Sequence, residues 1–205
     1  MANQDAPFGF RAVGGMGSSY ETQGTSKYQI TDNYSSSIFQ GDVVMTGDAG
    51  NDAEGTTTVA GYIAPAAAGD PNNVGIFNGC FYNDPTTQKP TWKNYYPTDT
   101  NITTGKIDAF VYDNPQQLFE AQTSGTFTQS DAGNLGDIGT YVAGSTINGR
   151  SKEELTETSI SNTATFRIIR LSEDPSNSDT SSANSNWIVR FNESIYYARV
   201  TKATT

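Results

Sequence analysis

The stretch KIDAFVY at residues 106–112 has the clearest strand character in the chain, and QLFEAQT at residues 117–123 follows it closely. Apolar and polar residues alternate along both runs with a period near two, which is the pattern of a β-strand with one buried face. Of the four residues between them, Asp113, Asn114 and Pro115 favour turns. This part of the chain therefore predicts short strands separated by short polar connections.

The same pattern recurs on both sides of this stretch. Short runs rich in Val, Ile, Thr, Tyr and Phe are separated by Gly, Pro, Asn or Asp, as in sandwiches and barrels. We therefore predict an all-β fold, either a β-sandwich or a β-barrel of short antiparallel strands with long polar loops. The further strand segments are residues 28–30, 37–45 (two short strands around a Gly41-Asp42 turn), 56–63, 74–82, 163–171 and 186–200.

Helical signals are few. Residues 131–135 predict one helical turn. Residues 151–155 have the spacing of a capping box, because Glu154 follows Ser151 by three residues. β-branched and hydroxyl residues come directly afterwards, so any helix there is short.

The N-terminal residues differ in composition from the rest of the chain. Residues 1–25 hold five glycines, one proline and few apolar residues, so they predict an extended N-terminal arm. Two interpretations of the arm stay open: a disordered terminus, or a segment that orders on a neighbouring molecule. Residues 26–205 predict a single β-rich domain. Within it, residues 47–55, 83–96 and 173–185 predict exposed loops.

The charge of the chain argues against several classes of partner. The formal net charge is −10, from 12 basic and 22 acidic residues, and the basic residues form no cluster. Nucleic-acid binding depends mainly on Lys and Arg that neutralise phosphates, so we expect none. No segment reaches the roughly 18–20 apolar residues of a membrane span, and residues 1–7 do not read as a signal peptide. We therefore expect the protein to be made in a cytoplasm and not to associate with a membrane.

The sequence offers little for catalysis. It contains no histidine and a single cysteine, Cys80, so Ser-His-Asp, Cys-His, histidine-metal and thiolate-zinc sites cannot be built. The apolar run around Cys80 favours a buried small hydrophobe over a nucleophile. Walker A and G-x-G-x-x-G sequences are absent. We therefore predict a protein that is not an enzyme and needs no cofactor or metal.

Carboxylates are the remaining route to chemistry. Glycosidases need two acids, and the acids that lie beside aromatic residues are Asp84, Asp108, Asp113 and Glu120. Acids that alternate with apolar residues along a strand, such as Asp108 and Glu120, usually form its solvent face, so a structural role is favoured. An acidic loop at residues 48–55 could offer oxygens to calcium, but its spacing differs from an EF-hand, which favours a solvated turn.

Two groups of aromatic and charged residues are candidates for binding a partner. The arm carries isolated large side chains. The end of the 83–96 segment carries Trp and Tyr, which are the residue types favoured at interfaces. These loop aromatics could stack on a sugar, pack into a partner or cap the domain's own core. The candidate partner-binding residues are Phe8, Phe10 and Arg11 in the arm and Trp92, Tyr95 and Tyr96 in the loop.

Several segments, in a constant order, resemble a family of structural proteins of tailed bacteriophages. Residues 6–13, APFGFRAV, are similar to the family's PFGFRPV start, with Ala12 in place of proline. Residues 38–44, IFQGDVV, resemble its IFxGDxV segment, and residues 74–82, VGIFNGCFY, resemble its VGVFxGxxY segment. The other similar segments are YYP at 95–97 (YWP in the family), residues 109–122 (VYDDPxxxFExQ) and NGRS at 148–151 (GRS).

This resemblance implies a capsid decoration, or cement, protein. Such proteins are typically β-rich, often trimeric, and sit on the capsid at junctions between capsomers. The implied partners are the major capsid protein and two further copies of the chain, and the implied location is the outer capsid surface of the virion. Two other functions stay open: a carbohydrate-binding surface or tail-associated virion module, in which the same aromatics stack on glycans, and a glycan-cleaving enzyme with paired acids.

Overall fold

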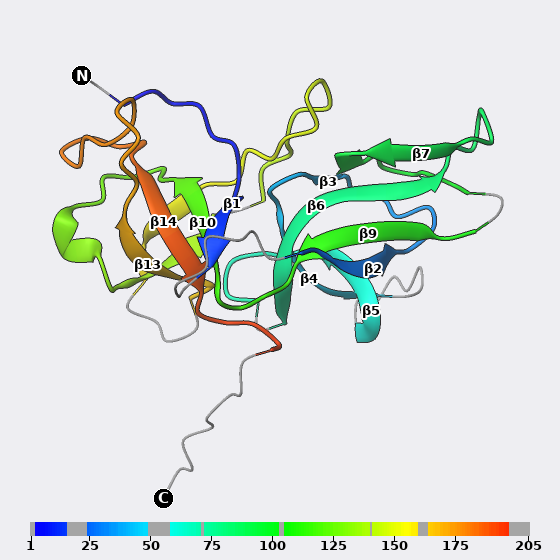
Figure 1. The fold of residues 1–205 in the computed structure, drawn as a ribbon, viewed down its shortest axis with the longest axis horizontal. Helices are drawn as coiled ribbons and strands as arrows, with labels where there is room; N and C mark the ends of the chain where they lie inside the picture. Colours follow the sequence, from blue (N-terminus) through cyan, green and yellow to red (C-terminus); the bar gives the residue numbers. More distant parts are fainter. Residues whose placement is uncertain are drawn as a thin grey trace, which may run out of the picture.

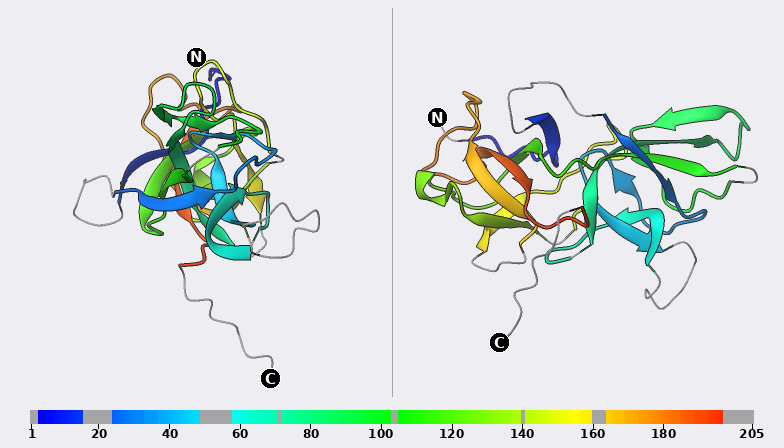
Figure 2. Two further views of the ribbon diagram at one scale, coloured as in Figure 1. Left: turned by 90° about the vertical axis from the view of Figure 1, so that its right-hand side faces the viewer. Right: turned by 60° about the horizontal axis from the view of Figure 1, so that its bottom comes forward.

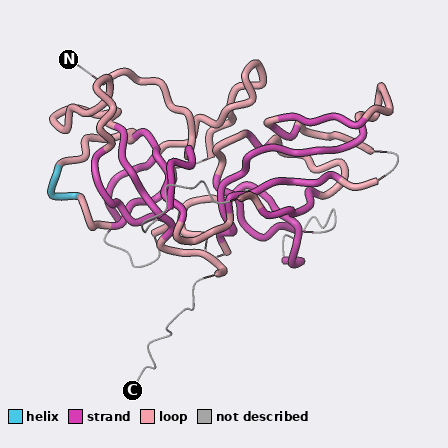
Figure 3. The backbone as a smooth tube through the Cα atoms, viewed as in Figure 1, coloured by secondary structure: helices cyan, strands magenta, loops and turns pink. Residues whose placement is uncertain are grey.

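The computed structural model describes residues 3–15, 24–48, 58–70, 72–102, 105–139, 141–159 and 164–196. These residues form 14 strands and one short 3-10 turn, η1 (Gln129–Asp131), with no α-helix among them. The chain is therefore all-β, as predicted. Figure 1 shows two lobes side by side, and in Figure 3 strands and their connections make up nearly all of the described chain.

One lobe is a closed five-stranded barrel. Strand β4 pairs with β5, β5 with β2, β2 with β9, β9 with β6, and β6 returns to β4. These pairings are antiparallel except that of β2 with β5, which is parallel. Strand β7 extends the sheet beyond β6 as an edge strand. The bounds are β2 Ser26–Ile30, β4 Val43–Asp48, β5 Thr58–Pro65, β6 Asn73–Asn83, β7 Pro90–Lys93 and β9 Ile107–Tyr112.

The barrel closes around the side chains that the sequence pattern assigns to its inner face. On β9, Ile107, Ala109 and Val111 are buried, while the residues between them are only partly buried and point outward. On β6, Phe77 and Cys80 are fully buried in the same core. The alternation in KIDAFVY therefore predicted both the strand and its buried face.

The second lobe is a curled, six-stranded antiparallel sheet in the order β1-β10-β14-β13-β11-β12. An isolated bridge between Thr123 and Leu155 brings the end of β10 back to the start of β12, so the sheet curls toward its own edge. Aromatic rings fill its interior, and Phe10 stacks on Phe166 with ring centroids 4.3 Å apart. The bounds are β1 Arg11–Gly15, β10 Gln117–Gln122, β11 Leu135–Ile138, β12 Leu155–Ser159, β13 Phe166–Leu171 and β14 Asn186–Phe191.

The two lobes are joined by a continuous core. Val43, Ala66 and Ile76 of the barrel belong to the same buried cluster as the aromatic rings of the second sheet. A small pair of strands, β3 (Ile38–Phe39) and β8 (Tyr95–Tyr96), lies beside the barrel. The right-hand view of Figure 2 shows the two lobes end to end. Apolar packing at the junction therefore ties the two lobes into one body.

The predicted N-terminal arm is part of this body where it is described. Residues 3–10 are extended without regular pairing, and β1 pairs with β10. The Asn3 amide donates to the Asp179 carbonyl at 2.8 Å, and the Asn177 amide donates to the Gln4 carbonyl at 2.9 Å. Asn177 is 5% exposed, so the 173–185 segment is a packed loop at this point, and the expectation of full exposure is wrong there. Residues 16–23 lie outside the described residues.

The predicted helical turn at residues 151–155 is wrong. The Ser151 hydroxyl accepts the backbone N–H of Glu153 at 3.0 Å, and Leu155 already begins β12. Ser151 and Glu153 are buried where the lobes meet, so their side chains serve the junction instead of a helix cap. The helical turn predicted at 131–135 occurs slightly earlier, as η1.

Candidate functional site

An aromatic cluster lies on the outer surface of the barrel, where β7, β6 and β9 run side by side. Trp92 is the cross-strand partner of Phe81, and its ring centroid lies 5.2 Å from that of Phe110. Trp92 is 49% exposed and Phe81 is 40% exposed. We call Phe81, Trp92 and Phe110 the aromatic face. Large rings that stay exposed together on a sheet are typical of a binding surface.

A glycine beneath the tryptophan shapes this face. A Cβ atom at Gly79 would lie 2.5 Å from the Trp92 ring and 2.9 Å from the Lys93 carbonyl oxygen, so only glycine leaves room for the ring at this height. The ion pair between Lys27 and Asp108, at 2.7 Å, lies on the neighbouring strands and gives the face a charged border. The face is therefore a fixed part of the barrel wall.

A projecting hairpin at residues 145–150 carries a second exposed apolar residue. Ile147 is 97% exposed. The Gly149 N–H donates to the Ser145 carbonyl at 2.7 Å, and the Asn94 amide donates to the Asn148 carbonyl at 2.7 Å. These bonds hold the hairpin closed and attach it to the residue that follows β7. In Figure 1 the hairpin extends outward between the two lobes.

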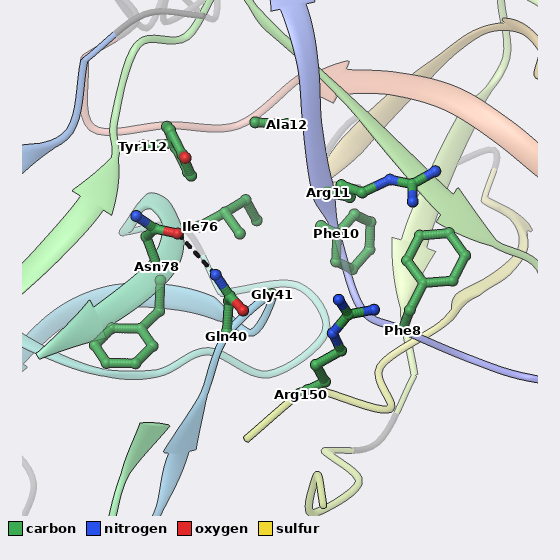
Figure 4. A pocket seen from close by; sticks show the side chains of 11 residues that line it. Phe8, Phe10, Arg11, Ala12, Gln40, Gly41, Ile76, Asn78, Tyr112 and Arg150 are labelled. Atoms are coloured by element: carbon green, nitrogen blue, oxygen red, sulfur yellow. Dashed lines mark hydrogen bonds between the residues drawn. The ribbon is translucent and has the colours of Figure 1, made fainter. Parts of the chain in front are cut away.

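A pocket of about 170 Å³ lies where the N-terminal segment crosses the barrel (Figure 4). We call it the junction pocket. It brings together three residues that the sequence singled out, Phe8, Phe10 and Arg11, with residues from four distant parts of the chain. The others that line it are Ala12, Gln40, Gly41, Ile76, Phe77, Asn78, Tyr112 and Arg150.

Arg11 is held by its own chain. Its guanidinium group forms an ion pair with Glu120 and lies 5.1 Å from the centroid of the Phe8 ring. Glu120 is 4% exposed, and its other oxygen accepts a hydrogen bond from the Ser172 hydroxyl at 2.5 Å. The expectation that Glu120 forms a solvent face is therefore wrong, because Arg11 and Ser172 satisfy its carboxylate inside the second lobe.

The other predicted partner-binding residues divide between core and surface. Phe10 and Tyr96 are buried, at 2% and 0% exposure, so the structure assigns both side chains to the protein's own core. Burial raises the pKa of Tyr96 to about 12. Tyr95 is partly buried and stacks on Phe39 with ring centroids 5.6 Å apart. Trp92 lies on β7 and the two tyrosines on β8, so the expectation of an exposed loop over 83–96 is wrong for residues 90–96. Of the three aromatics, Trp92 is the one with a largely exposed ring.

A pair of buried carboxyl groups, which the sequence did not reveal, lies between the lobes. Asp42 follows the turn after β3, and its carboxylate accepts the Phe39 N–H at 2.7 Å. Glu153 comes from the segment before β12, and its carboxylate accepts the Val43 N–H at 2.9 Å. Each acid keeps one buried oxygen without a hydrogen-bond partner, and neither takes part in an ion pair between described residues.

This environment favours the protonated form of both acids. Burial raises the pKa of Asp42 to about 7, against the opposing effect of hydrogen bonds from Phe39, Ser151 and Tyr141. Burial and then the nearby Asp42 carboxylate raise the pKa of Glu153 well above its usual range. Both groups are almost fully buried, so the pair holds protons without offering a substrate-accessible surface.

The acids considered for catalysis are used locally. Asp84 accepts the N–H groups of Thr86 and Thr87, both at 2.9 Å, and these bonds lower its pKa. Asp113 accepts the Tyr28 hydroxyl at 2.8 Å, and Asp108 is in its ion pair with Lys27. Each of these carboxylates therefore has a structural role, in a turn or on a sheet surface.

Cys80 is fully buried, and its thiol donates to the Tyr95 carbonyl at 3.5 Å. Burial raises its pKa to about 12, so the thiolate is disfavoured at neutral pH. The interpretation of Cys80 as a small buried hydrophobe is confirmed.

The acidic loop at 48–55 lies almost wholly outside the described residues, so the choice between a calcium site and a solvated turn stays a prediction. No helix in the described part of the chain is long and apolar enough to cross a membrane. No model of a known protein family, no curated protein and no solved structure matches the chain.

Proposed function

We propose that this protein is a non-enzymatic structural component of a bacteriophage virion, which binds the outer surface of the capsid and holds neighbouring major capsid protein subunits together. The observation that carries the proposal is the aromatic face, where Trp92 and Phe81 stay exposed on the wall of a closed barrel. Exposed Trp beside a second aromatic ring is the composition of a protein-binding hot spot.

The exposed apolar side chains are mounted on rigid elements, which favours tight binding. Trp92 is supported from below by Gly79 and from the side by Phe110, and the turn that carries Ile147 is closed by hydrogen bonds. Preorganised groups lose little conformational entropy when they bind. Full burial of one aliphatic side chain such as Ile147 contributes about 1.5–3 kcal/mol.

The segments that resemble capsid decoration proteins build the elements used here. VGIFNGCFY forms β6 beneath the aromatic face, and IFQGDVV contributes β3 and the turn at the junction of the lobes. A homotrimer, which the resemblance implies, presents the aromatic face three times around one axis. Binding at several capsomers at once then multiplies the affinity of a single weak contact.

The aromatic face also favours a second candidate function, a carbohydrate-binding virion module. A half-exposed Trp92 ring bordered by the Lys27–Asp108 pair offers a stacking surface next to polar groups. Sugars bind aromatic planes through their apolar faces and hydrogen-bond to polar neighbours. The two functions differ in the partner that the same face recognises.

Co-sedimentation with undecorated capsids tests the proposal. We expect the purified protein to bind such capsids at saturable stoichiometry, and Trp92→Ala to weaken binding by at least about 30-fold, the cost of losing one hot-spot side chain. Ile147→Ser tests the projecting hairpin. Ile195→Ser is its matched control, because Ile195 is 39% exposed on the segment after β14. Thermal unfolding checks that each variant is folded.

Each outcome separates the two candidate functions. Capsid binding that needs Trp92 supports the decoration role. Failure of the folded protein to bind capsids, together with Trp92-dependent binding on a glycan array, overturns the decoration role and supports the carbohydrate-binding one. If Ile195→Ser loses capsid binding and Ile147→Ser and Trp92→Ala do not, the docking surface lies near Ile195, and the assignment to the aromatic face and the hairpin is wrong.

A further inference from the structure

The junction pocket has a charge opposite to that of the whole protein. Two of the 12 basic residues, Arg11 and Arg150, line it, and none of the 22 acidic residues does. Its apolar lining residues that keep exposed surface are Phe8, Ala12 and Tyr112, while Phe10, Ile76 and Phe77 also line it but are almost fully buried. A pocket of this kind suits a group that is apolar on one side and negatively charged on the other.

The two arginines are not equivalent. Arg11 is neutralised by Glu120, and in Figure 4 its guanidinium group lies over the Phe8 ring, away from the pocket. Arg150 forms no ion pair with a described residue, and Figure 4 shows its guanidinium group extended toward Phe10 and Gly41. Arg150 therefore supplies the uncompensated positive charge. A guanidinium group matches a carboxylate with two parallel hydrogen bonds.

An amide pair adds a second donor. The Gln40 side chain donates to the Asn78 oxygen at 3.0 Å, which turns the amino group of Asn78 away from Gln40. Both amides line the pocket. The hydrogen bond fixes the orientation of the pair, so the Asn78 amino group is free to donate to an acceptor that enters beside Arg150.

The pocket is preformed and small. The Phe10 N–H donates to the Gly41 carbonyl and the Gly41 N–H to the Phe77 carbonyl, both at 2.9 Å. A Cβ atom at Gly9 would lie 2.5 Å from Cβ of Ser151, so the N-terminal segment packs tightly beside the opening. The volume of about 170 Å³ is below the roughly 300–1,000 Å³ of sites for nucleotides or drug-sized ligands. It suits a peptide segment of one or two residues.

From these observations we infer that the junction pocket binds an acidic peptide segment of a partner protein, with an apolar side chain against Ala12 and Tyr112 and a carboxylate on Arg150. The choice of a protein as the source of the carboxylate rests on the proposed function. The carboxylate can belong to an acidic side chain or to a chain end, and both present the same chemistry to the pocket.

Nuclear magnetic resonance titration of the full chain tests this inference. The probes are N-acetyl-leucine, which mimics a chain end, and the blocked dipeptide N-acetyl-Leu-Glu-amide, which mimics an acidic side chain. Their uncharged counterparts are N-acetyl-leucine amide and N-acetyl-Leu-Gln-amide, and inorganic phosphate is the simple anion. Binding is followed on the side-chain amides of Gln40 and Asn78 and the backbone amide of Gly41.

We expect at least one acidic probe to shift these three signals, and its uncharged counterpart to bind roughly 10- to 100-fold more weakly, the usual loss of a charge-assisted hydrogen bond. Arg150→Gln should weaken the acidic probe by a similar factor and leave the uncharged probe unchanged. Arg170→Gln, an exposed arginine on β13, is the matched control and should have no effect.

Three results overturn the inference: no shift at millimolar probe, equal binding of charged and uncharged probes, or phosphate binding as tightly as the peptides. Capsid co-sedimentation of Arg150→Gln keeps the two proposals distinguishable. Peptide binding without capsid binding leaves the pocket intact and refutes the decoration role. Capsid binding without any peptide binding supports that role and refutes the pocket.

Discussion

Replacing Asp42 by Asn should make the protein less sensitive to pH and more stable at neutral pH. Asn keeps the oxygen that accepts the Phe39 N–H, and it places an amino group where the Asp42 carboxyl has an unpartnered oxygen. It also removes a carboxyl group whose ionised form is destabilised by burial between the lobes. The folded state of the variant therefore no longer depends on the proton at this position.

The size of the effect follows from the raised pKa. The pKa of Asp42 rises from 3.8 to about 7 on folding, so between these values the folded chain holds a proton that the unfolded chain has released. Each pH unit in this range lowers the free energy of unfolding by about 1.4 kcal/mol. The contribution is complete below about pH 4, and about 4 kcal/mol of it is lost by pH 7.

Urea unfolding at pH 4.5, 6 and 7.5 measures this directly. The wild-type free energy of unfolding should fall across the series, and Asp42→Asn should fall less and be the more stable protein at pH 7.5. Glu173→Gln, at an exposed position, controls for the change in net charge. Glu153→Gln should also flatten the profile, since its acid shares the site. Parallel profiles for wild type and both junction variants would refute the buried, proton-holding pair.

Other predictions concern packing and accessibility. Gly79→Ala should displace the Trp92 ring, shift its fluorescence emission and lower the free energy of unfolding by about 1–3 kcal/mol, because the new methyl group overlaps the ring. Asn177→Ala should cost about 1–3 kcal/mol in urea unfolding, because it leaves the Gln4 N–H without its partner and the Gln4 carbonyl with Gln122 alone; an unchanged midpoint would show that the N-terminal segment is not held there. Cys80 should react with a chromogenic disulfide reagent at pH 8 only after unfolding, and rapid labelling of the native protein would contradict its burial.

Strands with strong alternation could be predicted from the sequence, and those without it could not. β9 buries every second residue, so the period located both the strand and its inner face. In β10 the alternation is weaker and Gln117, Glu120 and Gln122 are buried as well, so the pattern located the strand but not its faces. β1 (RAVGG) and β11 (LGDI) have too few large apolar residues to stand out, and they are strands because neighbouring strands offer them hydrogen-bond partners. The choice between sandwich and barrel depended on the pairing of β4 with β6, which is a long-range contact.

The candidate site was predicted in part. Trp92 was singled out because Trp and Tyr are favoured at interfaces, but Phe81 and Phe110 were assigned to strands without a face being distinguished. Arg150 and Asn78 have no local signal, because only the fold brings residues 8–12, 40–41, 76–78 and 150 together. The buried Asp42 looked like an ordinary turn acid, and nothing in its neighbours along the chain indicates that Glu153 faces it.

The contacts of the N-terminal segment have a consequence for biosynthesis. Asn3 binds a carbonyl 176 residues further along the chain, and β1 needs β10 as its partner. At a translation rate of about 5–20 residues per second, the first residues emerge roughly 10–35 s before their binding groove exists. The N-terminal segment must therefore dock last, after the ribosome has delivered most of the second lobe. Such high contact order predicts slow folding. Prematurely terminated chains would lack the residues against which the N-terminal segment packs.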